Sequence, residues 1–218
     1  MDFSEMQDYV ADELDDVLFG YFPRAKVKDW LNFAQLETQK LLLQTGEQWY
    51  TTLATQSTTT NARRYALPSD FLKVQRFELV LSGISPNQNI VQLEPITLNE
   101  QNLALTGPST PLGYYLRRRY FELVPIPSDE WALNLYYSYR VADMVLDTDE
   151  ADVPIQYQEL IPLIAARNGF TKDNRDPSIL NDKIKFYTDM MKQDAEDRRE
   201  DAPRSIVITN PEGYDFVY

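Results

Sequence analysis

The sequence predicts an α+β protein: a helical bundle formed from N- and C-terminal helices, with an inserted antiparallel β subdomain and an extended C-terminal tail. Two observations support this class. Apolar residues recur at helical spacing near both ends of the 218-residue chain, whereas they alternate with polar residues through its middle. The predicted boundaries are 1–46 for the N-terminal helices, 47–142 for the β subdomain, 143–201 for the C-terminal helices and 202–218 for a tail that docks on a partner.

The N-terminal region predicts two helices. Residues 3–18 carry apolar side chains at helical spacing, and Gly20 follows as a stop signal. The acids of this segment favour a solvated helix face over a dedicated site. A second helix is expected to begin after Pro23, a good first-turn residue, and to end near Gln44.

The middle of the chain predicts strands. β-branched and alternating residues indicate strands over 51–55, 64–67, 71–81 and 90–96, and a capping box at residues 97–100 predicts a short helix over 98–104. Residues 111–140 alternate apolar and polar side chains between breaks rich in Pro, Ser and Asp. This pattern predicts a meander of three half-buried antiparallel strands.

The C-terminal region returns to helical spacing. Apolar residues from Ile155 onward indicate one helix that ends near Gly169. Asp176 and Pro177 then predict the start of a second helix, which runs to about Asp201. Helices from the two ends are therefore expected to pack together around a common core.

Composition excludes several kinds of chemistry. The chain has no Cys and no His, so disulfides, thiolate zinc sites, Cys nucleophiles and His-based triads are absent. The 21 basic and 34 acidic residues give a net charge of −13, which disfavours groove readout of nucleic acid. No apolar run reaches the length of a membrane helix, so no membrane is expected as a partner.

The abundant carboxylates invite two further interpretations. A catalytic carboxylate pair is possible in principle, but a chain with 34 acids produces such pairs by chance. The acidic run from Asp147 begins like a calcium loop, yet Asp152 stands where Gly is needed and Gln158 where Glu is needed. We therefore expect a solvated linker there, with no catalytic, metal or cofactor-binding residues in the chain.

Two segments are candidate interface sites. Arg117, Arg118 and Arg119 form the densest basic cluster and fall at the tip of the first predicted hairpin. They either deter edge-to-edge aggregation or contact an acidic neighbour or phosphate. The tail contains apolar and aromatic side chains, which would add no stability if the tail were only a frayed chain end. We therefore favour docking on a partner over folding back on its own domain. The tail candidates are Ile206, Ile208, Tyr214, Phe216 and Tyr218.

Five motifs follow one another along the chain: Leu67-Pro68-Ser69-Asp70-Phe71, Thr110-Pro111 before Tyr114-Tyr115-Leu116, Leu123-Val124-Pro125-Ile126-Pro127, Leu133-Asn134-Leu135-Tyr136-Tyr137, and Val153-Pro154 with Tyr157 leading a helix. In this order they resemble the head-to-tail adaptor, or connector, proteins of tailed bacteriophages, especially the short-tailed type. The likeness covers residues 25–195. The chain departs from the family pattern in its Ser/Thr-rich loop at 56–61 and in having arginines where a turn with Gly is usual.

The resemblance implies a structural virion protein, made in the host cytoplasm and placed at the neck of the particle. It implies a ring, usually a dodecamer, that docks on the portal protein, continues the channel for double-stranded DNA without binding it specifically, and carries the next tail protein, a nozzle or tube. Two alternatives remain. One is a virion-associated, carboxylate-based hydrolase acting on cell-wall glycan, and the other is a glycan-binding β module, which the flanking helices disfavour.

Overall fold

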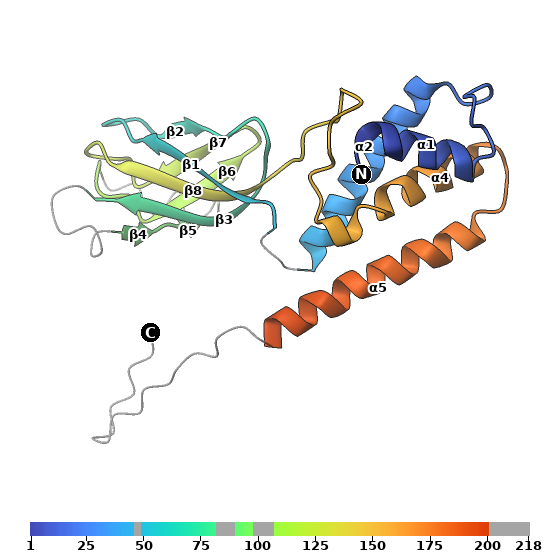
Figure 1. Cartoon of the computed structure of the whole chain (residues 1–218). Helices are drawn as coiled ribbons and strands as arrows, with labels where there is room; N and C mark the ends of the chain where they lie inside the picture. The colour runs from blue at the N-terminus through green and yellow to red at the C-terminus, as the bar shows by residue number, and fades with distance from the viewer. Residues whose placement is uncertain (46–48, 82–89, 98–106, 201–218) are drawn as a thin grey trace, which may run out of the picture. The chain divides into compact units, whose positions relative to one another are not determined.

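The computed structural model describes residues 1–45, 49–81, 90–97 and 107–200 (Figure 1). Helices occupy both ends of the chain and strands its middle, which confirms the α+β class. Contacts divide the chain into two compact units. We call residues 1–47 with 143–218 the helical unit, and residues 48–142 the β unit.

The helical unit is organised around one buried helix. Helix α4 packs against all three of its neighbours, α1, α2 and α5. It can do so because residues 160–166, with the sequence LIPLIAA, are buried on every side. The helices are α1 (Phe3–Glu13), α2 (Arg24–Gln44), α4 (Leu160–Lys172) and α5 (Ser178–Glu200), with a 3₁₀ turn η1 (Ile155–Tyr157) before α4.

The first helix is shorter than the apolar spacing predicts. Helix α1 ends at Glu13 instead of continuing to residue 18, because Asp15 adopts a left-handed backbone with φ 57°. The Asp16 carboxylate then accepts hydrogen bonds from the N–H groups of Gly20 and Phe22, at 2.8 and 2.7 Å. These side-chain bonds offer the backbone an alternative to another helical turn. The start and end of α2 agree with the prediction.

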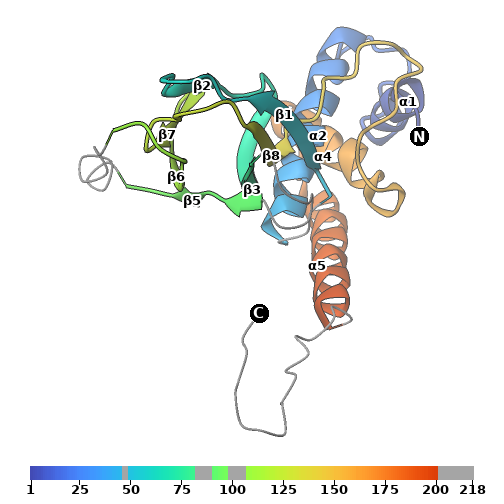
Figure 2. The same ribbon diagram turned by 90° about the vertical axis from the view of Figure 1, so that its left-hand side faces the viewer.

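The β unit is a pair of four-stranded sheets that enclose an aromatic core (Figure 2). One sheet has the order β1-β8-β3-β4 and the other β2-β7-β6-β5. Tyr65, Tyr114 and Phe121 of one sheet and Phe77 and Tyr137 of the other belong to one buried cluster. The strands are β1 (Thr51–Ser57), β2 (Arg64–Ala66), β3 (Phe71–Val80), β4 (Ile90–Gln92), β5 (Glu94–Pro95), β6 (Gly113–Arg117), β7 (Tyr120–Val124) and β8 (Ala132–Tyr139).

The predicted three-stranded meander is wrong in its third strand. Strands β6 and β7 form the expected antiparallel hairpin, but β8 pairs with β1 and β3 in the opposite sheet. The predicted strand over 90–96 is likewise divided, since Leu93 is buried between β4 and β5, which belong to different sheets. Strand β5 also pairs with β6 in parallel, so the second sheet is mixed. The predicted helix over 98–104 lies outside the described residues.

The C-terminal helices follow the predicted pattern with one shift. Helix α4 continues past Gly169 to Lys172, so this glycine lies inside the helix. Asp176 accepts a hydrogen bond from the Ser178 N–H at 3.0 Å, in keeping with its predicted place before the last helix. That helix, α5, ends at Glu200, within one residue of the predicted end.

Candidate functional site

The arginine run lies at the tip of the β6–β7 hairpin. Arg117 is the last residue of β6 and pairs with Tyr120, so Arg118 and Arg119 form a two-residue connecting turn. Both turn residues are exposed. Arg118 has φ 37°, in the left-handed region where a two-residue hairpin turn commonly has glycine or asparagine. The turn therefore presents two cations, although the left-handed backbone of Arg118 is energetically unfavourable for a residue with a side chain.

The solvent-facing side of this sheet places a carboxylate at the centre of the arginines. In the register of β2, β7 and β6, Glu122 stands opposite Arg64 on one side and Tyr115 on the other. Arg117 is the diagonal neighbour on the same face, because it lies two residues beyond Tyr115. The Glu122 side chain is only 4% exposed, although it lies on the face that points away from the aromatic core.

Three guanidinium groups share the Glu122 carboxylate. Arg64 Nε donates a hydrogen bond to it at 3.0 Å, which raises the pKa of the Arg64 guanidinium above its usual value. Arg63 Nε and Arg117 Nε lie 3.2 and 3.7 Å from the carboxylate oxygens, close enough for ion pairing. Neither of these two nitrogens has the geometry of a hydrogen bond, so they contribute to the cluster through charge. The cluster keeps an excess of positive charge.

An open hollow of about 400 Å³ lies beside these arginines. It is lined by Tyr115, Leu116, Arg117, Arg118 and Tyr120, and we call it the arginine hollow. The Arg117 guanidinium lies 5.4 Å from the Tyr115 ring centroid, and that of Arg64 lies 4.9 Å from Tyr120. The hollow thus combines cations, tyrosine rings and an exposed leucine, a mixture that is typical of protein–protein interfaces.

The excess of acidic over basic residues belongs to the helical unit. The β unit has eight basic and seven acidic residues, a net charge of +1, whereas the rest of the chain has 13 basic and 27 acidic residues, a net charge of −14. The expectation that the chain repels a polyanion therefore applies to the helical unit and not to the arginine hollow.

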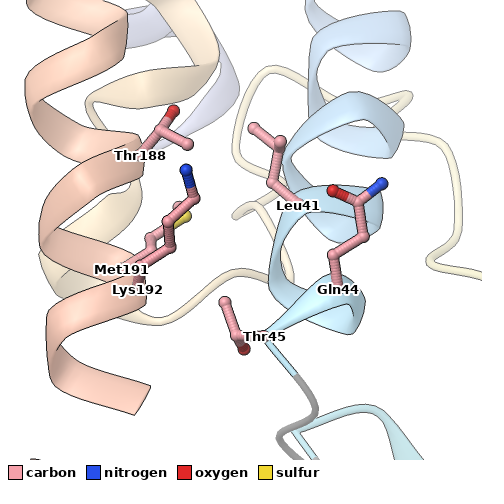
Figure 3. A pocket seen from close by; sticks show the side chains of 6 residues that line it. All are labelled: Leu41, Gln44, Thr45, Thr188, Met191 and Lys192. Atoms are coloured by element: carbon pink, nitrogen blue, oxygen red, sulfur yellow. The ribbon is translucent and has the colours of Figure 1, made fainter. Parts of the chain in front are cut away.

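The described residues of the helical unit line a groove and a smaller hollow. A groove of about 470 Å³ is lined by residues of α1, α4 and α5, and it contains the carboxylates of Glu159 and Asp182. The Tyr187 hydroxyl donates a hydrogen bond to Glu159. A smaller hollow of about 60 Å³ lies between the end of α2 and α5 (Figure 3), too small for a typical organic ligand. It is lined by Leu41, Gln44, Thr45, Thr188, Met191 and Lys192.

The linker that began like a calcium loop is used for packing. The Asp147 carboxylate accepts hydrogen bonds from Lys28 at 2.7 Å and Gln7 at 3.3 Å, contacts that hold its pKa below the usual value. Asp149 accepts the N–H groups of Val145 and Leu146. Within the described residues, no cluster of three His, Cys, Asp or Glu could hold a metal ion, and no helix has the length and apolarity of a membrane span.

The sequence profile of one family, described as the SU10 adaptor protein, matches residues 1–208. The chain belongs to this family. Membership confirms the resemblance to phage head-to-tail adaptor proteins, and it assigns the chain a structural role at the head–tail junction of a virion. No curated protein matches the chain.

In this member of the adaptor family, sequence reasoning found only part of the arginine site. It located Arg117, Arg118 and Arg119 at a hairpin tip, but it missed Arg63, Arg64 and Glu122. A signal was present, since Glu122 interrupts an otherwise apolar strand and Arg63-Arg64 precedes a strand. Five predicted tail residues lie outside the described residues: Ile206, Ile208, Tyr214, Phe216 and Tyr218.

Proposed function

We propose that this adaptor-family protein assembles as a ring, a dodecamer, that docks on the portal protein and carries the next tail component. The observation that carries the proposal is the family match over residues 1–208. The ring extends the DNA channel of the portal and provides a platform for a nozzle or tube protein. Its role is structural and non-enzymatic, in keeping with a chain that has no His and no Cys.

The charge distribution supports a channel role. Each copy carries a net charge of −13, and an acidic lumen repels DNA phosphates, so double-stranded DNA slides through without specific binding. The same charge opposes ring closure, because neighbouring copies repel one another. Closure therefore requires apolar, hydrogen-bonded and locally complementary contacts between unlike faces of identical copies.

The tail is the proposed contact with the portal. Residues 202–218 place Ile206, Ile208, Tyr214, Phe216 and Tyr218 in a short segment, and aromatic anchors contribute much of the binding energy in protein interfaces. Strand addition to an edge of the portal would use the same residues. The arginine tip is then free to contact a different neighbour.

The test mixes the purified chain with rings of the cognate portal and measures the mass of the complex. We expect a discrete complex whose added mass corresponds to twelve copies. A variant that ends at residue 201 is expected to lose portal binding while its own fold, followed by circular dichroism, stays unchanged. A chain that stays monomeric with and without portal would contradict the adaptor ring, whereas undiminished binding of the truncated chain would contradict only the role of the tail.

A further inference from the structure

The loop between α1 and α2, residues 14–22, exposes apolar side chains. Val17, Leu18 and Tyr21 are 64%, 92% and 67% exposed. Exposed apolar side chains that are grouped on a folded surface mark a contact site, because a partner that covers them removes them from water. We call residues 14–22 the α1–α2 loop.

The α1–α2 loop is held in one shape. The Asp16 carboxylate accepts N–H groups from Gly20, Tyr21 and Phe22 at 2.7 to 3.2 Å, and these bonds hold the pKa of Asp16 below its usual value. Phe22 is buried and packs edge-on against Trp30, with ring centroids 5.1 Å apart. A partner that covers Leu18 therefore binds a preformed loop and loses little conformational freedom of the backbone.

Two exposed carboxylates lie beside the apolar part of this loop, and Arg24 lies 4.4 Å over the ring of Phe19. Asp12 at the end of α1 and Asp15 in the loop are exposed, and the Arg175 guanidinium contacts Asp15 directly at 3.3 Å. An exposed pair of this kind contributes little, so its carboxylate can exchange partners at low cost. The loop thus combines an exposed leucine with carboxylates.

The arginine hollow has the complementary chemistry. It offers the guanidinium groups of Arg117 and Arg118 beside the apolar surface of Leu116 and two tyrosines. Three arginines already surround Glu122, so an additional carboxylate is attracted by the uncompensated charge. The mixture of rings and leucine favours a protein occupant over DNA, since phosphate backbones offer no apolar group to cover Leu116.

We propose that the arginine hollow of one copy receives the acidic, apolar α1–α2 loop of a second copy. The contact is heterologous, because the two surfaces differ, and repetition of one heterologous contact generates a ring. The proposed contact opposes the net repulsion between copies, because it places the arginine hollow of one copy against the acidic helical unit of the next. This inference rests on the proposed ring.

The test reverses one charge on each surface. Arg118→Glu changes the hollow and Asp12→Arg changes the end of α1 beside the loop, while Lys73→Glu and Asp197→Arg reverse exposed charges elsewhere in the same units as matched controls. On portal rings, we expect each of the first two variants to assemble about tenfold more weakly than the wild type, and each control to assemble normally. Thermal unfolding of every variant checks that the fold is retained.

An equimolar mixture of Arg118→Glu and Asp12→Arg chains is the decisive sample. Alternating copies would restore every contact, so the mixture is expected to assemble like the wild type. Normal assembly of both single variants would overturn the inference while leaving the portal ring intact. Rescue only when both changes are in one chain would show that the contact is internal, and loss of DNA retention by Arg118→Glu without loss of assembly would assign the hollow to phosphate. Failure of the wild type itself to assemble would instead refute the proposed function.

Discussion

Arg118 keeps a backbone conformation that suits glycine. Its φ of 37° brings the Cβ atom close to the following carbonyl oxygen, at a cost of about 1–2 kcal/mol for a residue with a side chain. A glycine at this position would remove that strain. The retention of a cation at a strained turn is consistent with a contact role for the arginine hollow.

Arg118→Gly is expected to raise the free energy of unfolding by about 1 kcal/mol, because glycine adopts this conformation without the steric cost. The measurement is urea unfolding of the variant beside the wild type. Arg119→Gly is the matched control, since Arg119 lies in the same turn outside the left-handed region, and it should leave stability unchanged or lower it. Equal effects of the two changes would refute strain at Arg118.

Glu122 is expected to matter more for stability than the arginines around it. Glu122→Gln removes a buried charge that three cations share, so we expect a loss of about 2 kcal/mol in the free energy of unfolding. Arg64→Gln should cost much less, because the Arg64 side chain is 64% exposed and water replaces its contact. Urea unfolding compares the two, and equal losses would contradict the asymmetry.

Helices α1 and α4 approach each other closely at a glycine, a contact that apolar periodicity alone does not reveal. Gly169 lies inside α4, where an added Cβ would come within 2.6 and 2.8 Å of the two methyl carbons of Leu14. Leu14 is buried and caps α1, so the glycine allows the end of α1 to approach α4 closely. In the sequence this glycine resembles a stop signal, but it serves as a packing position.

Gly169→Ala is therefore expected to destabilise the chain despite the better helix propensity of alanine. Overpacking costs about 1–3 kcal/mol and the propensity gain returns about 1 kcal/mol, which leaves a net loss of about 1 kcal/mol. Gly107→Ala is the control, because a Cβ at Gly107 meets no atom within 4 Å and should not lower stability. Thermal unfolding of both variants measures the difference. A Gly169→Ala protein as stable as the wild type would mean that Leu14 moves aside freely.

At the scale of the whole molecule, charge is divided between the two units. The helical unit carries a net charge of −14 and the β unit +1, so the acidic composition describes only one part of the surface. A protein with this charge distribution can repel DNA over most of its surface and still attract a carboxylate at the arginine hollow. The net charge of −13 for the whole chain does not reveal this local excess of positive charge.

We expect the chain to bind double-stranded DNA more weakly than about 10⁻⁴ M at physiological salt, the weak end of ordinary non-specific binding. Fluorescence anisotropy with a labelled duplex measures this affinity. Arg118→Glu should leave it unchanged, because the hollow is assigned to a protein partner. Tight, salt-sensitive binding that this variant abolishes would contradict an anionic channel protein.

Local pattern was sufficient for the types of the described elements, the α+β class and the order of motifs that resembles the adaptor family. Helical and strand periods are carried by neighbouring residues, and the absence of His and Cys is a property of composition, so neither requires knowledge of distant contacts. Tertiary structure decided the rest: that β8 joins the opposite sheet, and that Arg63 and Arg64 meet Glu122 across β2 and β7. Those outcomes depend on which strands pair and in which register, and residues far apart in sequence settle pairing together through the core that they bury.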